Sequence, residues 1–327
     1  SDTHTIQSVL VEVQQQIETF RRMRSEHDAL AGLPSGYTDL DKITTGFKGG
    51  ELIVLAARPG HGKTALALNI AEHIAISADR REHKKSGGGG CAVFSLEMRA
   101  SELVSRMLCS LAGVSLRDVR NGNLSQGDEN NLRDATERLA QSPLFIDDSF
   151  TISMAEIRAK CRRLKERYDI ECVMVDYIQL ISGDSGVDRH ELIGRYSRGL
   201  KALARELNVP VFALSQLNRQ IEQRRGVQQR PMLSDLRESG SIEQDADMVM
   251  FIQRDRMLSA EEMKRAQQEA ELLEGREKFN FLDVEPATLV VAKNRSGPIG
   301  DVTLSFRKSC TRFEAMELNA HAHFASS

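Results

Sequence analysis

The residues whose chemistry is easiest to infer lie in a short glycine-rich segment. Gly62-Lys63-Thr64 follows the apolar run from Leu52 to Ala57 and precedes a helical pattern. In a strand, loop and helix of this kind, backbone N–H groups hold phosphate oxygens, the lysine reaches the terminal phosphates and the hydroxyl helps to hold Mg²⁺. The segment therefore predicts a P-loop for ATP and Mg²⁺, although Ala57 replaces the first glycine of the motif and a turn that binds nothing is the alternative. The predicted nucleotide-binding residues are Arg58, Pro59, Gly60, His61, Gly62, Lys63, Thr64 and Ala65, of which His61 is more simply explained as loop filler.

A P-loop needs a second carboxylate to hold its metal ion, and Asp176 can provide it. This residue ends the apolar run from Cys172 to Asp176. Because parallel strands end at one edge of a sheet, its side chain is expected beside the phosphates. Apolar strands also end in Asp for capping alone, but together with the P-loop the pattern favours Thr64 and Asp176 as the metal-side residues.

Two further residues follow apolar runs and have a possible role in hydrolysis. Glu97 comes after the run from Cys91 to Ser95 and is the candidate base that deprotonates water. A carboxylate that stabilises the N-terminus of a helix explains Glu97 about as well. Gln216 directly follows the run from Val209 to Ser215 and is a candidate contact to the γ-phosphate, although polar residues often simply end a strand.

The elements that must position these residues follow from the alternation of short apolar runs and amphipathic stretches. Runs that are apolar on both faces are typical of buried strands, and strands that alternate with helices predict parallel βαβ units. We therefore expect an α/β fold with a mostly parallel sheet flanked by helices. The predicted strands are Leu52 to Ala57, Cys91 to Ser95, Cys172 to Asp176, Val209 to Ser215 and Met248 to Ile252, and the predicted helices include Thr64 to Ala78 and Arg195 to Leu207.

The C-terminal part has a different pattern. The runs from Ala287 to Lys293 and from Asp301 to Phe306 flank residues 294–298, which predict a hairpin turn and hence antiparallel strands at the end of the fold. Two polar inserts interrupt the plan. Arg80 to Gly90 is expected to be a mobile loop or an introduced change, and Ser259 to Lys278 a solvated helix.

The N-terminal segment predicts an amphipathic helix of its own. Its apolar residues recur at helical spacing, and residues 32–36 with two glycines and a proline separate it from the rest. The helix either packs on its own domain or docks on another subunit. We expect a linker helix and connector over 1–31 and a motor domain over 32–327. The apolar positions are Ile6, Leu10, Val13, Ile17 and Phe20.

Composition excludes some classes of protein. A formal net charge of −3 over 327 residues means that nucleic-acid binding would need a local basic patch. The five cysteines form no CxxC pair, which argues against a zinc site or a disulfide framework and favours a reducing cytoplasm. No apolar run approaches the roughly 18 residues of a membrane span. Because the chain starts at Ser1 rather than Met, we expect a fragment whose own N-terminal region is missing.

Several motifs in order and at characteristic spacing resemble the DnaB family of bacterial replicative helicases. The most specific is the block from Asp235 to Asp247, DLRESGSIEQDAD. The similarity extends from about Gly32 to Phe313 and implies a RecA-like P-loop ATPase core that forms the C-terminal motor domain of a DNA helicase. The other motifs are Ala57-Arg58-Pro59, Phe94 to Met98, Val175 to Leu180, Leu214 to Arg219 and Lys293 to Pro298.

The resemblance also implies roles for individual residues. Lys63 and Thr64 match the nucleotide lysine and metal-side hydroxyl, and Asp176 the Mg²⁺-side aspartate. Lys293 and Arg295 match a basic pair that reaches into the site of a neighbouring subunit, where a cation can stabilise the charge that develops on the γ-phosphate. Glu97 matches the catalytic glutamate and Gln216 the γ-phosphate sensor, while the DNA-gripping loops match Arg219, Arg237, Glu238, Ser239 and Gly240.

The family further implies a homohexameric ring that moves 5′ to 3′ on single-stranded DNA, together with primase and a helicase loader as partners. Both inserts look longer than expected for the family, and the N-terminal domain of the family is absent from the sequence. The alternatives are a RecA-type recombination or other ring ATPase, which the block from Asp235 to Asp247 disfavours, and a nucleic-acid binding module that uses ATP only for assembly. Glu97 together with Lys293 and Arg295 argues against the latter.

Overall fold

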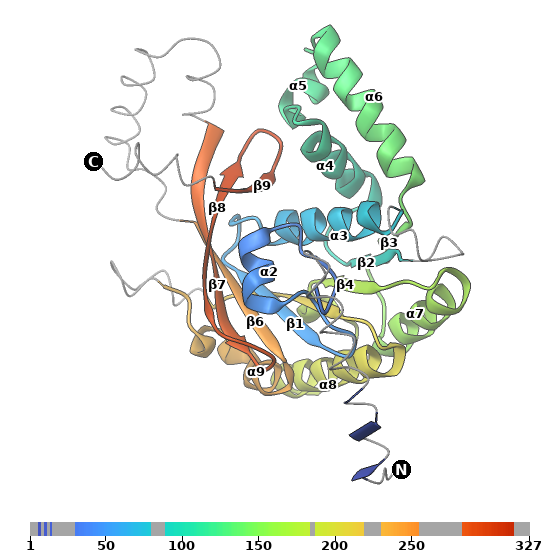
Figure 1. Ribbon diagram of the computed structural model, residues 1–327, viewed down its shortest axis with the longest axis vertical. Helices are drawn as coiled ribbons and strands as arrows, with labels where there is room; N and C mark the ends of the chain where they lie inside the picture. Colours follow the sequence, from blue (N-terminus) through green and yellow to red (C-terminus); the bar gives the residue numbers. More distant parts are fainter. Residues whose placement is uncertain are drawn as a thin grey trace.

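The computed structural model describes residues 30–79, 89–183, 187–218, 230–254 and 283–316, together with Ile6, Gln7, Leu10, Val11 and Gln14. Within these ranges the chain forms one nine-stranded sheet with the order β3-β2-β4-β5-β1-β6-β7-β8-β9 (Figure 1). The strands are β1 (Leu52–Ala57), β2 (Cys91–Ser95), β3 (Leu144–Asp147), β4 (Cys172–Asp176), β5 (Val211–Gln216), β6 (Met248–Arg254), β7 (Val284–Asn294), β8 (Gly300–Arg307) and β9 (Arg312–Ala315).

The sheet is parallel from β3 to β6 and antiparallel from β6 to β9. The central strands β1, β2 and β4 are buried along their whole length, which is why they read as uninterrupted apolar runs. The predicted α/β class and the predicted C-terminal hairpin are therefore confirmed.

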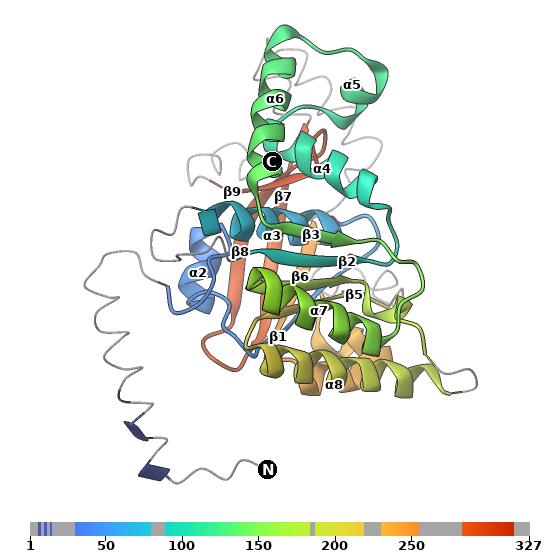
Figure 2. The ribbon, with the colours of Figure 1, turned by 90° about the vertical axis from the view of Figure 1, so that its right-hand side faces the viewer.

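Helices cover both faces of the sheet (Figures 1 and 2). On one face, Ile53 and Leu55 of β1 pack in a core with residues of α2, α3 and α4. On the other face, Leu52 and Val54 pack with residues of α7, α8, η4 and α9. Alternate residues of β1 thus belong to two separate hydrophobic cores, one on each face of the sheet. The helices are α2 (Thr38–Thr44), α3 (Lys63–Asp79), α4 (Ala100–Ala112), α5 (Leu116–Asn121), α6 (Gln126–Gln141), α7 (Met154–Tyr168), α8 (Arg189–Leu207) and α9 (Gly240–Asp245), with 3-10 turns η1 (Ile178–Leu180) and η4 (Leu233–Ser239).

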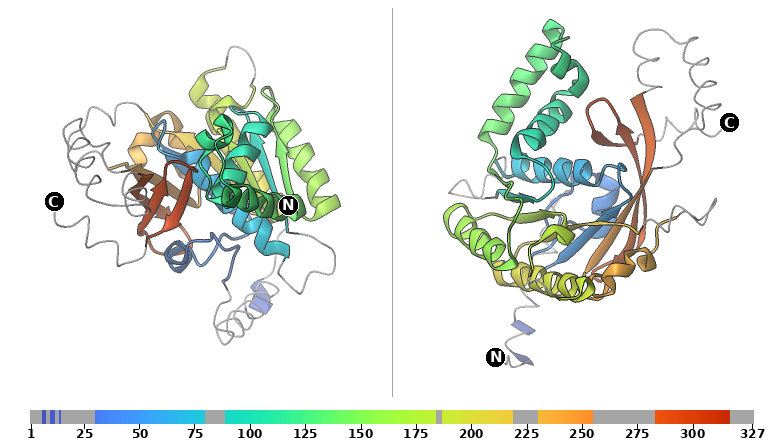
Figure 3. Two further views of the ribbon diagram at one scale, coloured as in Figure 1. Left: turned by 90° about the horizontal axis from the view of Figure 1, so that it is seen from above. Right: turned by 180° about the vertical axis from the view of Figure 1, so that it is seen from behind.

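Helices α4, α5 and α6 project away from the sheet beyond α3, while β7 and β8 run along the side opposite to α7 (Figure 3). Side-chain caps mark the start of several helices. Ser125 and Asp128 form a capping box at α6, and Ser153 and Glu156 form one at α7. These reciprocal hydrogen bonds satisfy backbone N–H groups that the first turn of a helix leaves free.

Some predicted boundaries were wrong in detail. The strand expected from Val209 begins at Val211, since Val209 joins the turn after α8 through its N–H bond to the carbonyl oxygen of Ala204 (3.2 Å). Helix α8 begins at Arg189 rather than Arg195, capped by the side chain of Asp188. The antiparallel strands are longer than expected at both ends.

Other predictions are tested only in part. Most of the insert at 80–90 and all of the insert at 259–278 lie outside the described residues. Of the predicted N-terminal helix, five positions are described, and they are helical with Ile6 and Leu10 exposed. All five cysteines are buried thiols without a disulfide bond. Among the described residues, no helix combines the length and apolar character that crossing a bilayer requires.

Candidate functional site

The predicted P-loop connects β1 to α3 at the carboxyl edge of the parallel strands. Gly60 and Gly62 have φ angles of 78° and 90°, a backbone region that residues with a side chain rarely enter. A Cβ on Gly62 would also lie 2.9 Å from the ring of Phe313. The loop therefore needs glycine at this position for conformation and for space. Helix α3 begins at Lys63, so that Lys63, Thr64 and Ala65 lie in its first turn and the predicted residues from Arg58 to Gly62 form the loop before it.

Asp176 lies against both predicted partners in this turn. Its Oδ2 accepts a hydrogen bond of 2.6 Å from the Thr64 hydroxyl, and its Oδ1 lies 3.0 Å from Nζ of Lys63. Only 4% of Asp176 is exposed, and the Lys63 ammonium is the partner of Oδ1. Two strands and one helix thus bring an ammonium, a hydroxyl and a carboxylate together as predicted.

Glu97 and Gln216 lie on the same edge. Ser95 of β2 is in register with Asp176, and the N–H of Leu96 donates to the carbonyl oxygen of Asp176 (2.7 Å), so that the exposed Glu97 follows directly. Gln216 is in register with Ala57 and is exposed. Both residues line a cleft of about 300 Å³ above the P-loop. The lining residues are Ala57, Arg58, Pro59, Gly60, Gly62, Lys63, Thr64, Ala65, Glu97, Met98, Arg106, Tyr177, Gln216, Phe306 and Thr311.

The cleft also contains residues that the sequence analysis missed. Nζ of Lys63 lies 4.4 Å from the centre of the Tyr177 ring, a cation–π contact. Burial and the nearby negative charge of Glu97 raise the pKa of Tyr177, which therefore acts as a neutral ring under the lysine. Arg106 comes from α4, and no local motif marks it. Tyr177 does have a local signal in the sequence, because it directly follows the strand that ends in Asp176.

Arg254 holds the P-loop from the end of β6. Its guanidinium donates to the carbonyl oxygen of Gly60 (2.9 Å) and to Glu285 (2.7 Å), and it lies 4.3 Å from the centre of the Phe306 ring. Burial alone would raise the pKa of Glu285, but hydrogen bonds from Arg254 and Lys308 hold it below its usual range. The charged pair of Arg254 and Glu285 therefore links the P-loop to the C-terminal hairpin.

Lys293 and Arg295 lie at the opposite edge of the sheet. Asn294, at the end of β7, is in register with Met248 at the start of β6, whereas the P-loop follows the other end of the parallel strands. Nζ of Lys293 donates to the carbonyl oxygen of Glu243 (2.6 Å), and burial and the charge of Arg295 lower its pKa. The structure does not bring this basic pair to the P-loop of its own chain.

The predicted DNA-contacting residues are only partly described. Arg219 lies outside the described residues, and for residues 237–240 the backbone alone is described, at the end of η4 and the start of α9. The N–H of Asn218 donates to the carbonyl oxygen of Asp235 (3.2 Å), so that η4 is joined to the end of β5. The block from Asp235 to Asp247 thus runs from the nucleotide edge of the sheet back to the edge with Arg295.

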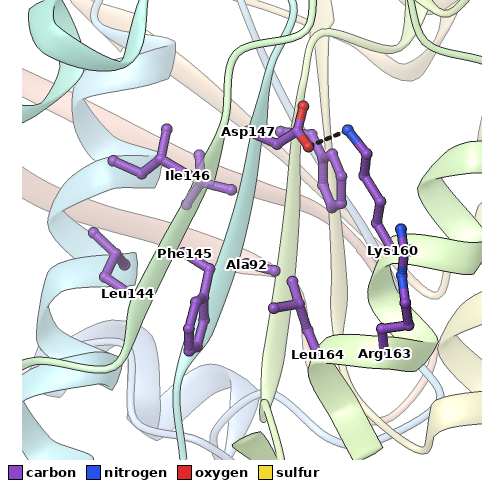
Figure 4. Close-up of a pocket in the computed structure, with 10 residues that line it drawn as sticks. Ala92, Leu144, Phe145, Ile146, Asp147, Lys160, Arg163 and Leu164 are labelled. Carbon is purple, nitrogen blue, oxygen red and sulfur yellow. Dashed lines mark hydrogen bonds and ion pairs between the residues drawn. The ribbon is translucent and has the colours of Figure 1, made fainter. Parts of the chain in front are cut away.

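A second cleft of about 440 Å³ lies between the edge strand β3 and α7 (Figure 4). Phe145, Ile146 and Leu164 give it apolar walls. Lys160 pairs with Asp147 and donates to Ser149 (3.3 Å), so that its charge is already compensated. This cleft contains none of the predicted site residues.

A P-loop whose lysine and threonine contact an aspartate at the end of a parallel strand defines a P-loop nucleotide-binding domain. One solved structure, described as an ATPase domain, is similar over 97% of this chain and 100% of its own, with a TM-score of 0.77 and 33% sequence identity. A structure described as that of a DnaB-like replicative helicase and its interactions with primase is similar over 97% of this chain and 68% of its own, with a TM-score of 0.75 and 33% identity.

The chain belongs to the family of the DnaB-like helicase C terminal domain, whose profile matches residues 32–315. It is 42% identical over 314 residues to the replicative DNA helicase DnaC of Bacillus subtilis (strain 168) and 41% identical over 314 residues to the replicative DNA helicase DnaB of Geobacillus stearothermophilus. Each alignment covers 95% of this chain and 62% of the relative, so the chain spans less than two thirds of their length.

Proposed function

We propose that this chain is the ATP-hydrolysing motor of a replicative DNA helicase, which moves 5′ to 3′ on single-stranded DNA as a homohexameric ring. The observation that carries the proposal is the contact of Asp176 with both Lys63 and Thr64, 3.0 Å and 2.6 Å long, in a chain of the DnaB-like family. Glu97 and Gln216 line the same cleft, where they would supply a base for the attacking water and a contact to the γ-phosphate.

The residues of the P-loop fit ATP with Mg²⁺. Thr64 and Asp176 offer a hydroxyl and a carboxylate, the hard oxygen ligands that Mg²⁺ prefers, and the carboxylate of Asp176 is buried beside the Lys63 ammonium. When bound, the metal ion would neutralise negative charge on the phosphates. Lys63 would contact the terminal phosphates, while the backbone N–H groups at the start of α3 would hold the others.

Glu97 and Gln216 would act on the reacting groups. Glu97 is exposed in the cleft, where its carboxylate could take a proton from the attacking water. Gln216 is placed by β5 beside the end of β1, where its amide could contact the γ-phosphate and report its loss. Together with Lys63, these side chains would orient the phosphates and the water rather than form a covalent intermediate.

The nucleotide site would be completed by a neighbouring subunit. Lys293 and Arg295 lie at one edge of the sheet and the P-loop at the other, separated by the length of β1, which is roughly 17 Å for six residues. A cation at this edge cannot serve its own P-loop, but in a ring it would face that of the next chain. Such a cation contributes about 10³–10⁵ in rate, which explains why the ring would be needed for hydrolysis.

The DNA would be held by main-chain and polar groups of the central loops. The proposed contacts reach backbone phosphates and therefore read no sequence. As partners beyond DNA we propose primase and a helicase loader. This proposal is supported by the similarity to replicative helicases, one of which is described with its interactions with primase. The proposed DNA contacts are Arg219, Arg237, Glu238, Ser239 and Gly240.

An unwinding assay on forked DNA tests the proposed function. With ATP and Mg²⁺, the protein should separate a fork that offers a single-stranded 5′ tail for loading and leave intact a fork with only a 3′ tail. Single-stranded DNA should also stimulate phosphate release. Stimulated phosphate release without separation of either fork would favour the ring ATPase that binds DNA without processive unwinding.

A further inference from the structure

Asp247, the residue directly before β6, is bound to both β1 and the turn that carries Arg295. Its Oδ2 accepts a hydrogen bond of 2.8 Å from the N–H of Leu52 and pairs with Nζ of Lys201. Its Oδ1 lies 3.4 Å from a guanidinium nitrogen of Arg295. The backbone of Asp247 binds the same two residues. The N–H of Asp247 donates to the carbonyl oxygen of Leu52 (2.9 Å), and the carbonyl oxygen of Asp247 accepts from the N–H of Arg295 (2.8 Å).

The guanidinium of Arg295 is held on one side and open on the other. It donates to the carbonyl oxygen of Gln244 (2.7 Å) and to Asp247, while 49% of the side chain remains exposed. A guanidinium has five N–H donors in a rigid plane, so these contacts leave others for an anion outside the chain. The contacts fix the direction of the side chain without covering it.

Arg295 shares the carboxylate of Asp247 with a second cation, Lys201. Asp247 is one carboxylate between two cations, and Lys201 makes the closer contact. Lys201 also donates to the carbonyl oxygen of Gly50 (2.7 Å), and only 14% of its side chain is exposed. Because Lys201 pairs with the same carboxylate at closer range, Asp247 orients Arg295 without being a counter-ion for Arg295 alone.

We propose that Asp247 is a positioning residue that aims Arg295 at the nucleotide of the neighbouring subunit. The inference rests on the proposed function, in which Arg295 acts on that nucleotide. Asp247 also binds Leu52, the first residue of the strand whose last residue leads into the P-loop. The direction of the guanidinium is therefore tied to the strand that positions the nucleotide site of its own chain.

A double-mutant cycle on the assembled protein tests this role. Asp247→Asn keeps the shape of the side chain but removes the charge that holds Arg295. It should lower kcat for DNA-stimulated phosphate release by about 10²-fold, the typical effect of a misplaced catalytic group, and leave binding of a fluorescent ATP analogue unchanged. In an Arg295→Ala background the same change should have no further effect, because Asp247 would act through Arg295.

The outcomes separate this inference from the proposed function. A further loss of kcat on adding Asp247→Asn to Arg295→Ala would show that Asp247 acts elsewhere and would overturn the positioning role. A fully active Arg295→Ala ring would overturn both the role of Arg295 and the inference. A loss of nucleotide affinity in Asp247→Asn would indicate a general effect on β1 and contradict the positioning role.

Two additional variants control for folding. Asp301→Asn removes an ion pair with Arg230 (2.7 Å) from the same hairpin and should keep wild-type kcat. Asp247→Asn combined with Lys201→Met removes both the carboxylate and the ammonium that pairs with it, so that no unpaired ammonium is left at position 201. This double variant should be as defective in kcat as Asp247→Asn alone, and a return to wild-type kcat would mean that the stranded lysine, not Arg295, caused the loss.

Discussion

Asp176 makes contacts that would change when a nucleotide binds. Its carboxylate is nearly buried and touches both the Lys63 ammonium and the Thr64 hydroxyl. In this arrangement the lysine neutralises the carboxylate that would otherwise be buried with an unpaired charge. Phosphates would compete for Lys63, and the vacated carboxylate would then be available to a cation. Lys63, Thr64 and Asp176 thus satisfy one another's charges and hydrogen-bonding groups, and the same groups are suited to hold phosphates and a cation.

The separate roles proposed for Glu97 and Lys63 give a direct prediction. Glu97→Gln should retain binding of an ATP analogue and lose steady-state hydrolysis by about 10²–10⁴-fold, because it removes the base and leaves the phosphate cradle. Lys63→Ala should lose nucleotide binding as well. Phosphate release and fluorescence titration measure the two quantities. Hydrolysis by Glu97→Gln within a few-fold of wild type would refute the role of Glu97 as base.

At the scale of the elements, the sequence indicated the buried strands far better than the edges. β1, β2 and β4 are apolar on both faces because helices cover both, so their bounds could be read from the sequence. The edge strand β3 has four half-buried residues, and β9 alternates Arg312 and Glu314 with apolar residues. Short strands with polar positions carry little periodicity, and neither was predicted.

In the candidate site, too, the sequence indicates some residues and not others. Lys63, Thr64 and Asp176 belong to local patterns that mark both the residue and the element before it. Arg254 contacts a carbonyl group 194 residues away, and no local pattern contains that information. Folding brings such residues together, so sequence reasoning on one chain finds the residues of the P-loop and misses the arginine that holds it in place.

Glu72 gives a prediction at this scale, because it joins α3 to β9. One of its oxygens lies 3.5 Å from the Arg312 guanidinium, and the other is buried without a partner. Burial raises the pKa of Glu72 to about 7, more than the charges of Arg312 and Arg138 lower it. An acid with a raised folded-state pKa stabilises the fold below its unfolded pKa, and this contribution is lost as the pH rises through about 7.

Compared with Glu72→Gln, the wild-type protein should therefore lose roughly 2 kcal/mol of unfolding free energy between pH 5 and pH 8. Denaturant unfolding of both proteins at the two pH values measures this difference. Glu314→Gln, which changes a more exposed carboxylate on β9, should keep the wild-type pH dependence. Parallel pH profiles for the wild type and Glu72→Gln would contradict the prediction.

In the whole molecule, one sheet carries two functional edges. The P-loop, Asp176 and Glu97 lie where the parallel strands end, and Lys293 and Arg295 lie where they begin. In the proposed ring, neither edge would be a complete site for hydrolysis by itself. Each chain would give its P-loop edge to one shared site and its edge with Arg295 to the next.

DNA binding by such a ring should depend on salt and hardly on base composition. On single strands each neutralised phosphate contributes roughly 0.7 to the slope of log affinity against log salt concentration. Arg237→Ala should therefore lower the slope by somewhat less than one unit for each phosphate that the variant no longer neutralises. Fluorescence titration with oligo-dT and mixed sequences over a range of salt measures both effects. Tight preference for one sequence over oligo-dT would contradict the proposed phosphate contacts.

The P-loop and Arg295 lie at opposite edges of the sheet, and we therefore predict that Arg295 acts in trans, on the nucleotide of a neighbouring chain. Arg295→Ala and Glu97→Gln chains should each be nearly inactive, because one lacks the cation and the other the base. In a mixed ring, an interface with Glu97 from the first chain and Arg295 from the second contains both groups, so phosphate release should partly return. If Arg295 acted on the nucleotide of its own chain, no arrangement of the two variants would contain an intact site. The mixture would then form rings that remain as inactive as the separate variants.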